Sequence, residues 1–286
     1  MQKINREIYT KERSLYALSD AELLDVKFLK GNDDGESPLK ESNDIVLKRC
    51  YFDLRYPLWH DENVEIKDCE FTINSRAPLW YSRNIRIKQS LINGVKAIRE
   101  CEQIDIKNSK INSPEFMWRN IDINIKNCEI EGEYAFFESK NINIQSINFK
   151  GKYSFQYVEN MEINDSNLDT KDAFWHTKNV VVKNTILKGE YLGWYSEGLT
   201  LINCTIISHQ PLCYCKNLKL INCKMDNSDL AFEYSEVEAT LIGSIQSIKN
   251  PLKGKIVVDE VKEIVDEQDK YQGNAEIVIR EYEEDK

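Results

Sequence analysis

The sequence of 286 residues contains no long hydrophobic run. No stretch approaches the about 18 consecutive apolar residues that a membrane-spanning helix requires. The first residues, 1–7, also lack the apolar core of a signal peptide. We therefore expect no membrane partner and a cytoplasmic location.

The chain has fewer basic than acidic residues and very few histidines. The chain has 38 Lys and Arg against 48 Asp and Glu, a net charge of −10, and only three histidines. Nucleic acids and anionic membranes are bound through basic surfaces. The composition therefore predicts that nucleic acid is not a partner.

Recognisable catalytic and cofactor motifs are missing. The sequence has no glycine-rich nucleotide-binding loop, no HExxH zinc motif and no nucleophile elbow. Cys213 and Cys215 form one close pair, but no second pair has the spacing that would complete a zinc site. We expect neither a metal site nor a cofactor.

The sequence contains instead a repeat of 19 residues. Aliphatic anchors recur at this spacing, with one step of 21 between Ile66 and Ile87. A repeat this short, rich in β-branched residues and asparagine, is typical of a solenoid whose turns rest on one another. The anchors are Leu47, Ile66, Ile87, Ile106, Ile125, Ile144, Ile163, Val182, Leu201 and Leu220.

Each repeat has the pattern of three short strands separated by corners. Apolar positions lie two residues before and five residues after the anchor, and polar residues alternate with them. Amides at the corners tolerate left-handed backbone and can bond from turn to turn. The pattern predicts an all-β fold, a single-stranded parallel β-helix of about eleven coils, and the handedness of β–crossover–β connections favours a right-handed one.

Both ends of the chain depart from the repeat. Residues 1–25 are irregular and charged and are expected to form an N-terminal cap, because open strand edges need protection. Phe28 keeps the repeat, one period before Leu47. Residues 26–249 are assigned to the β-helix and 250–286 to a C-terminal cap. We expect this cap to contain strands at 256–258 and 277–279, a weakly helical segment at 259–270 and an acidic tail at 281–286.

Cysteine shares one column of the repeat with other small residues. Three residues after the anchor, the column accepts Cys, Ser and Thr alike, so it requires a small side chain. We expect buried, reduced thiols in an interior ladder rather than disulfides. The cysteines of this column are Cys50, Cys69, Cys128, Cys204 and Cys223.

The third strand carries the residues that suggest function. Six residues before each anchor, every side chain is ionisable or carries a hydroxyl group, and strand stacking would place these side chains in a line about 4.8 Å apart. We call this line the polar column. As read from the sequence it comprises Glu41, His60, Tyr81, Glu100, Arg119, Glu138, Tyr157, His176, Tyr195, Tyr214 and Glu233.

Two chemical roles are open for the middle of the polar column. Glu100, Arg119 and Glu138 follow one another, and an arginine between two carboxylates is an ordinary surface ion pair. The same two carboxylates could serve as general acid and base in a glycan-degrading hydrolase or lyase, with Tyr157 or His176 assisting. The other members of the column would then bind the ligand.

The apolar neighbour of the polar column is not fixed by the pattern. Strict alternation turns the indole-rich column before it inward and the column of Leu58, Met117 and Phe136 outward, and a bulge would reverse this. Either way an apolar column flanks the polar one. Such a surface suits sugar rings, or an interface with a second copy of the chain.

The third-strand segments resemble a bacterial family of uncharacterised right-handed parallel β-helix proteins, a domain of unknown function. The resemblance covers nearly the whole chain and implies the fold without an activity. More distantly, the architecture is similar to pectate-lyase and polygalacturonase β-helices, whose calcium-binding acid clusters and paired catalytic aspartates have no counterpart here. The segments are 43–63, 77–82, 96–101, 113–116, 151–157, 172–176, 189–195, 210–215 and 230–235.

Three functions remain open from the sequence. The first is binding of a carbohydrate-like ligand on the third side of the helix, with or without catalysis. The second is glycan hydrolysis or elimination by Glu100, Arg119 and Glu138. The third is a structural scaffold whose aromatic side is a homo-oligomer interface.

Overall fold

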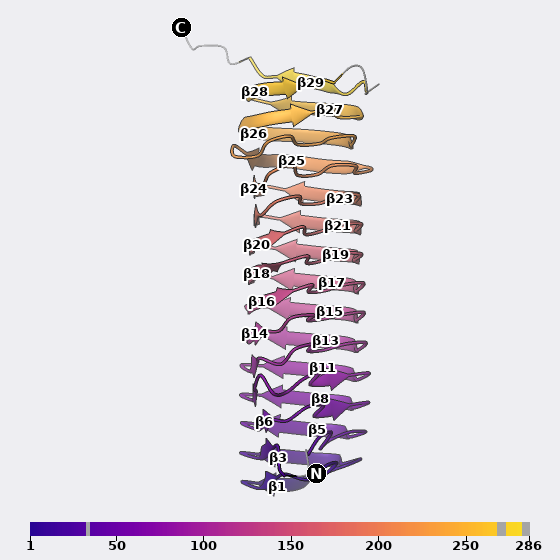
Figure 1. The fold of residues 1–286 in the computed structure, drawn as a ribbon, viewed down its shortest axis with the longest axis vertical. Coiled ribbons are helices and arrows are strands. Elements are labelled where there is room, and N and C mark those ends of the chain that lie inside the picture. The colour runs from indigo at the N-terminus through magenta and orange to yellow at the C-terminus, as the bar shows by residue number, and fades with distance from the viewer. Residues whose placement is uncertain (33–34, 268–272, 282–286) are drawn as a thin grey trace. The chain divides into compact units, whose positions relative to one another are not determined.

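Parallel strands that recur once per turn make up the regular structure of the protein (Figure 1). The computed structural model describes residues 1–32, 35–267 and 273–281. The chain divides into two compact units, Met1–Lys150 (unit 1) and Gly151–Lys286 (unit 2). Together they contain about 14 turns of about 19 residues, so the expected β-solenoid is confirmed and the expected number of eleven coils is too small.

The first side of unit 1 is a ladder of parallel strands in which anchor pairs with anchor. Ile66 pairs with Ile87 and Ile87 with Ile106, so the two extra residues between the first pair lie outside this ladder. A slip of one residue would turn every apolar side chain outward, and burial of the anchors therefore fixes the register. The strands are β1 (Gln2–Asn5), β3 (Ser19–Leu24), β5 (Asn43–Lys48), β8 (Glu62–Lys67), β11 (Arg83–Lys88), β13 (Glu102–Lys107), β15 (Ile121–Lys126) and β17 (Lys140–Gln145).

Unit 2 has the same ladder on its first side. Val182 pairs with Leu201 and Leu201 with Leu220, and the register then shifts within the long strands that follow. The strands are β19 (Glu159–Asn164), β21 (Lys178–Lys183), β23 (Glu197–Ile202), the first halves of β25 (Leu218–Met225) and β26 (Glu236–Lys249), β27 (Lys253–Val258) and β29 (Glu276–Ile279). The second halves of β25 and β26 continue the second side, and β28 (Glu260–Val265) pairs with β26 there.

A second side of shorter strands follows the amide corner of each turn. In unit 1 these are β2 (Ile8–Tyr9), β4 (Lys27–Leu29), β6 (Tyr51–Asp53), β9 (Glu70–Phe71), β12 (Leu91–Ile92), β14 (Lys110–Asn112) and β16 (Glu129–Glu133). In unit 2 they are β20 (Asn167–Lys171), β22 (Ile186–Lys188) and β24 (Thr205–Ile207), and β18 (Asn148–Lys152) spans the unit boundary.

The third side is mostly not a strand. Two-residue strands form only at β7 (Leu58–Trp59) and β10 (Leu79–Trp80), and isolated bridges join Arg99 to Trp80 and to Trp118. In unit 2 isolated bridges join His209 to Asp229 and Ala231 to Ile248, and elsewhere in the described ranges this side consists of turns and bends. The expected three strands per coil are therefore two strands and a turn segment in most coils, and this turn segment presents the polar column.

The interior of each unit is built from ladders of like residues. In unit 1 the ring centroids of Phe28 and Phe52 are 4.9 Å apart and those of Phe52 and Phe71 are 4.5 Å apart, with nearly parallel planes. Phe28 lies on the second side and pairs with Phe52, so its assignment as an anchor is wrong, and Leu23 pairs with Leu47 instead. The loop before Leu47 holds five extra residues, which hid this register.

The thiol and amide ladders that the sequence predicts are both present. All eight cysteines are buried and unbonded to one another by disulfide. At one corner of unit 1, the amide of Asn84 donates to Asn63 at 2.6 Å, and that of Asn63 donates to Asp44 at 2.9 Å. These side chains sit on left-handed residues, with φ between 52° and 56° for the three, a conformation that Asn and Asp adopt most readily among non-glycine residues.

The two expected caps differ from the structure. Residues 1–25 contain β1, β2 and β3, which pair in register with later strands of unit 1 and so form solenoid turns. The strands expected at 256–258 and 277–279 are present as parts of β27 and β29. The segment from Asp259 is not helical, because β28 pairs with β26 and Ile264 packs beside Ile248. Residues 268–272 and 282–286, with most of the acidic tail, lie outside the described residues.

Candidate functional site

Left-handed backbone at alternate residues decides which side chains of the third side point outward. In one turn of unit 1, φ is 54° at Tyr134, 65° at Phe136 and 55° at Glu138. The Ser139 amide donates to the Phe136 carbonyl at 3.3 Å, so Phe136–Ser139 form a four-residue turn with a left-handed third residue. This geometry interrupts strand alternation, and it leaves Phe136 fully buried beneath Glu138.

The same backbone geometry decides which apolar column lies beside the polar column at the surface. The column of Leu58, Leu79, Ile98, Met117, Phe136, Phe155 and Phe174 is interior, each at most 2 % exposed. The column between it and the polar column, which we call the indole column, is half-buried at Trp59, Trp80, Trp118, Phe137, Trp175 and Trp194. The surface beside the polar column is therefore formed by the edges of large rings.

In unit 1 most side chains of the polar column contact one other side chain. The hydroxyl of Tyr16 donates to Glu41. His60 stacks on Tyr81 with ring centroids 5.1 Å apart and planes inclined by 14°. Arg119 Nε donates to Glu138 Oε2 at 2.7 Å, and this bond, with a smaller contribution from Glu100, raises the pKa of Arg119.

Glu100, Arg119 and Glu138 occupy the same position on consecutive turns, as the sequence predicts. The Glu100 amide donates to the Trp118 carbonyl at 3.0 Å, and the Arg119 amide donates to the Phe137 carbonyl at 2.9 Å. About half of the Arg119 and Glu138 side-chain surface is exposed, at 51 % and 42 %. Glu138 is thus engaged by Arg119 on an open surface, which is the arrangement of an ordinary ion pair.

Arg99 is a residue of this region that sequence reasoning missed. It takes the place of an indole in the indole column, and its guanidinium carbon lies 5.2 Å from the ring centre of Trp80 and 4.5 Å from that of Trp118. Its side chain is 9 % exposed and its Nη1 is 3.7 Å from Glu115. The signal was available, since an arginine stands in a column that otherwise holds Trp and Phe from Trp59 to Phe137.

Two buried donors near Arg99 lack acceptors. The indoles of Trp59, Trp118, Trp175 and Trp194 each donate to a backbone carbonyl of the following turn. Trp80 Nε1 makes no such bond, and neither does Arg99 Nε. Burial lowers the pKa of Arg99, against the opposing effect of Glu115. Trp80 thus differs from the other four indoles of the column, whose Nε1 groups are all paired.

In unit 2 the polar column becomes a continuous stack of rings. Tyr157, His176, Tyr195 and Tyr214 lie face to face, with successive centroids 5.0, 4.9 and 4.8 Å apart and planes within 11°. The next ring, Tyr234, is 5.7 Å from Tyr214. We call these five residues the ring ladder. Tyr157 and Tyr195 are 46 % and 44 % exposed, so ring edges with their hydroxyl groups face outward.

Glu233 does not belong to the polar column, and its assignment there is wrong. The Tyr195 amide donates to the Cys213 carbonyl, and the Tyr214 amide donates to the Glu233 carbonyl, so Glu233 continues the indole column. One extra residue in this turn shifts the register, and Tyr234 takes the outward position. Glu233 is 6 % exposed and bonds Lys249 at 3.0 Å and Gln210 at 2.8 Å.

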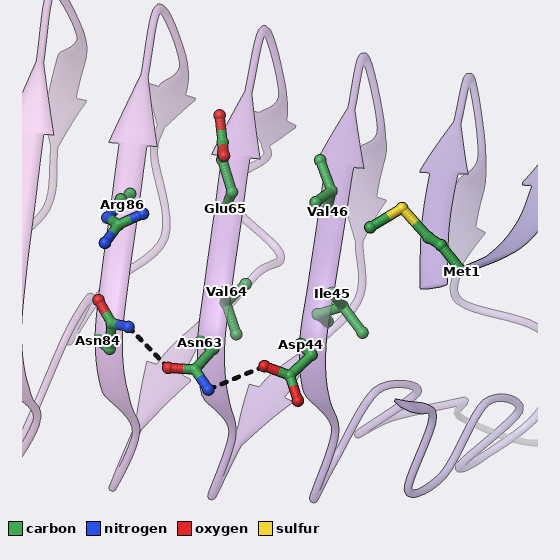
Figure 2. Close-up of a pocket in the computed structure, with 9 residues that line it drawn as sticks. All are labelled: Met1, Asp44, Ile45, Val46, Asn63, Val64, Glu65, Asn84 and Arg86. Atoms are coloured by element: carbon green, nitrogen blue, oxygen red, sulfur yellow. Dashed lines mark hydrogen bonds between the residues drawn. The ribbon is translucent and has the colours of Figure 1, made fainter. Parts of the chain in front are cut away.

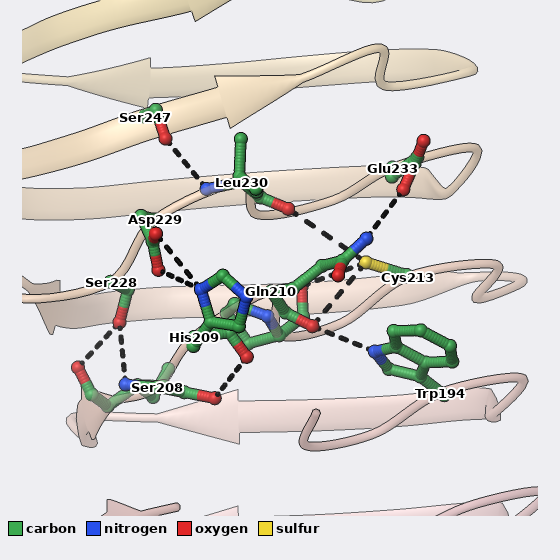
Figure 3. A network of polar contacts seen from close by, with 12 residues as sticks. Trp194, Ser208, His209, Gln210, Cys213, Ser228, Asp229, Leu230, Glu233 and Ser247 are labelled. Atoms are coloured by element: carbon green, nitrogen blue, oxygen red, sulfur yellow. Dashed lines mark hydrogen bonds and ion pairs between the residues drawn. The ribbon is translucent and has the colours of Figure 1, made fainter. Parts of the chain in front are cut away.

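The imidazole of His209 lies at the start of the third side in unit 2 and contacts the carboxylate of Asp229 (Figure 3). His209 Nδ1 is 2.9 and 3.0 Å from the two carboxylate oxygens of Asp229. The Tyr191 ring packs edge-on against His209, and the Gln210 carbonyl accepts the Trp194 indole proton at 2.8 Å. A carboxylate-held imidazole can act in acid–base chemistry, but none of the contacts drawn brings a nucleophile to it. Sequence reasoning missed this pair, because the two residues are 20 apart rather than 19.

The cavities of unit 1 lie away from the polar column. A pocket of about 200 Å³ lies on the outer surface of β5, β8 and β11, above the Asp44–Asn63–Asn84 amide ladder (Figure 2). A shallow groove of about 890 Å³ follows the other amide corner over four turns. Neither contains a polar-column residue.

Across the described ranges, no group of three or more His, Cys, Asp or Glu is placed to hold a metal ion, and no helix is long and apolar enough to cross a bilayer.

The family of the chain follows from comparison with family models. The model "Protein of unknown function (DUF3737)" matches residues 2–279, and the chain belongs to this family. A search of curated proteins finds no match.

Solved structures with a similar fold are only distantly related in sequence. The A-module of the Azotobacter vinelandii mannuronan C-5 epimerase AlgE6 is 10% identical, with 98% of this chain and 89% of that chain covered and a TM-score of 0.42. The Streptococcus pneumoniae surface protein and adhesin PfbA is 10% identical, with 97% and 85% covered and a TM-score of 0.28. The tailspike protein 3 of bacteriophage CBA120 is 10% identical, with 96% and 56% covered and a TM-score of 0.31.

Proposed function

We propose that this member of the DUF3737 family binds an extended carbohydrate-like ligand along the ring ladder of unit 2. The observation that carries the proposal is the stack of Tyr157, His176, Tyr195 and Tyr214 at 4.8 to 5.0 Å, with exposed edges. Sugars present hydroxyl groups at their periphery, and a regular row of phenol and imidazole groups can donate to and accept from them.

The backbone under the ladder argues that the rings serve more than the fold. The φ angles at Tyr157, His176 and Tyr195 are 57°, 56° and 60°, the same left-handed conformation that the amide corners fill with Asn and Asp. A bulky residue there costs about 1–2 kcal/mol relative to right-handed backbone. Stacking returns about 0.5–1.5 kcal/mol per ring pair. The rings therefore bring little net stability over asparagine, and recognition by their edges accounts for their presence.

The mode of binding follows from ring orientation. Because each ring covers the face of the next, the faces of the inner rings are unavailable for stacking on a sugar. Recognition would depend on hydroxyl groups and ring edges. Phenylalanine should therefore fail to replace tyrosine, although it would preserve the stack.

The experiment compares a hydroxyl-deletion variant with a matched control. Glycan-array screening of the wild-type protein identifies a ligand, and calorimetry then follows the triple variant Tyr157→Phe/Tyr195→Phe/Tyr214→Phe. Loss of three hydrogen bonds predicts affinity lower by about tenfold or more, with an unchanged melting temperature. The control variant Tyr9→Phe/Tyr51→Phe/Tyr134→Phe removes three hydroxyl groups outside the ladder and should bind normally.

Two outcomes would overturn the proposal. One is equal affinity in the triple variant and the control. The other is a homo-oligomer that the ladder variant alone converts to monomer, which would assign the ladder to an interface between copies of the chain. Phe155 is fully buried, so its substitution would test folding rather than an interface.

A catalytic role for Glu100, Arg119 and Glu138 remains a separate proposal with its own test. The Arg119–Glu138 ion pair at 2.7 Å supports a structural role. If the three residues catalyse glycan cleavage, Glu138→Gln should abolish turnover of the glycan that the array identifies while leaving its affinity intact. Absence of turnover in the wild-type protein would end this alternative.

A further inference from the structure

Five lysines occupy one outward position on consecutive turns of unit 1. Lys48 pairs with Lys67, Lys67 with Lys88, Lys88 with Lys107 and Lys107 with Lys126 in the parallel ladder of the first side. Successive members are therefore about 4.8 Å apart at the backbone. We call these residues the lysine row. The chain as a whole has a net charge of −10, which makes such a concentration of positive charge unusual in it.

Most of the positive charge in the row is not neutralised within the protein. Lys48 Nζ is 3.1 Å from Glu22, and Lys107 Nζ is 2.8 Å from Asp105. The ammonium groups of Lys67, Lys88 and Lys126 form no hydrogen bond or ion pair with any residue that the structure describes, and neither does the guanidinium of Arg86, which points outward from the same strand as Lys88 (Figure 2). Like charges directly opposite one another in a sheet repel, so the row opposes folding rather than promoting it.

The fold does not require lysine at this position. In unit 2 the same position holds Asn164, Lys183, Ile202 and Ile221, which pair with one another in the same register. Neutral and apolar side chains are thus compatible with the turn geometry. The requirements of folding therefore do not explain the uninterrupted lysine row in unit 1.

A groove with hydrogen-bonding walls runs beside the row. Each of Lys67, Lys88, Lys107 and Lys126 directly precedes a residue that lines the shallow groove of about 890 Å³. Most of its lining is polar. The side-chain amides are Gln89, Asn108 and Asn127, the hydroxyls are Ser90 and Ser109, and the carboxylates are Asp68, Glu70 and Glu129. A ligand lying here would meet ammonium groups along one edge and neutral or acidic acceptors along the other.

We propose that the lysine row and its groove bind a linear acidic polysaccharide. A chain of uronate sugars carries one carboxylate per ring, a repeat comparable to the about 4.8 Å between turns. Its carboxylates would pair with the lysines, and its hydroxyl groups would donate to the carboxylates and amides of the groove. The site lies wholly within unit 1 and is independent of the ring ladder in unit 2.

Charge and composition favour a polysaccharide over nucleic acid. The carboxylates of Asp68 and Glu70 can accept hydrogen bonds from sugar hydroxyl groups, which a polyuronate carries on every ring and a phosphate backbone lacks. Binding of single-stranded nucleic acid also relies on aromatic platforms for base stacking. The outward positions next to the row, Val46, Glu65, Arg86, Asp105 and Asn124, offer no ring.

The test uses the full chain and polygalacturonate oligomers as the probe. Affinity is measured by calorimetry at low ionic strength for the wild-type protein and for Lys67→Gln/Lys88→Gln/Lys126→Gln. The control, Lys178→Gln/Lys216→Gln/Lys224→Gln, makes the same change in net charge at exposed positions of unit 2. Neutral galactan, polyglutamate and single-stranded DNA are the comparison ligands.

The expected result is that only the row variant loses affinity, by about tenfold or more, and that its melting temperature does not fall, since repulsion is relieved. Wild-type affinity should also weaken as salt is added. The proposal is overturned if the wild-type protein does not bind polygalacturonate, if the row variant and the control bind it alike, or if polyglutamate or DNA binds as tightly. The Tyr→Phe variant of the ring ladder should bind polygalacturonate normally, which separates this site from the function proposed above.

Discussion

The guanidinium carbon of Arg99 lies 4.5 Å from the ring centre of Trp118 and 5.2 Å from that of Trp80, so that one buried cation is held between two indoles of neighbouring turns. A planar guanidinium stacks on a ring, whereas an ammonium group is a compact charge that does not. Removing the cation also leaves a gap in a close-packed column.

We predict that Arg99→Ala lowers the free energy of unfolding by about 2–3 kcal/mol, and that Arg99→Lys recovers less than half of this loss. Urea denaturation of the two variants and the wild-type protein measures both values. A lysine variant as stable as the wild-type protein would show that charge, not stacking, is what this position needs.

Asp61 is a carboxyl group inside the solenoid, 2 % exposed, and burial raises its pKa well above the ordinary value of 3.8. Its Oδ1 accepts from the Ser42 amide at 2.8 Å, while Oδ2 lacks a partner. The same column holds Asn120, whose Oδ1 accepts from Cys101 and whose Nδ2 donates to Ile98. The interior column that contains Asp61 therefore accepts an asparagine side chain with its amide hydrogen-bonded.

We predict that Asp61→Asn stabilises the protein by about 1–3 kcal/mol at neutral pH, because it removes the cost of a buried ionisable group. A carboxyl with a raised native pKa keeps its proton after the unfolded chain has lost it. Stability therefore falls as the pH rises from 3.8 toward the native pKa and stays low above it.

The substitution should abolish this part of the pH dependence. Melting temperatures of the wild-type protein and Asp61→Asn across the acid-to-neutral range provide the measurement, with the exposed Asp68→Asn as the control. Parallel curves for wild type and Asp61→Asn would contradict the assignment.

Burial of the cysteines predicts a second measurable property, and Cys101 and Cys215 show it most clearly. Burial raises the pKa of Cys101 and of Cys215 to about 12, and all eight cysteines are buried. Since the thiolate is the reactive form, a disulfide reagent should modify these residues only at the rate of unfolding. Asn108→Cys adds a thiol at an exposed corner and should be modified at once. Rapid modification of any native thiol would show that the interior opens locally.

Two glycines should respond in opposite ways to substitution. At Gly189 φ is 141°, and an added Cβ would lie 2.2 Å from the Thr170 carbonyl oxygen. Gly189→Ala should therefore cost more than about 2 kcal/mol. At Gly198 φ is 69°, in the amide column between Asn179 and Asn217, where the nearest atom to a Cβ is the side-chain oxygen of Asn179 at 3.2 Å.

Gly198→Asn should accordingly be neutral or stabilising by up to about 1 kcal/mol, since it extends the amide ladder and restricts the unfolded chain. Thermal unfolding of both variants distinguishes the two positions. A loss of stability in Gly198→Asn equal to that in Gly189→Ala would mean that the ladder does not accept a further amide there.

Sequence reasoning recovered the solenoid and its interior columns because these depend on local spacing. The register Ile66 to Ile87 to Ile106 is visible as a recurrence of apolar residues, and burial of one face enforces it. Where residues were added, the same reasoning failed. Phe28 was misplaced by the long loop before Leu47, and Glu233 by one extra residue in its turn.

The sequence by itself determined that turns of about 19 residues stack in parallel, and therefore that Glu100, Arg119 and Glu138 stand in line. Only the tertiary structure decided which side chains of the third side face solvent. That choice depends on left-handed φ angles at residues such as Phe136 and Glu138, which common residue types rarely adopt alone and which the hydrogen bonds to adjacent turns impose. The lysine row, the stacked rings and the partners of Arg99 likewise exist only once turns are laid side by side.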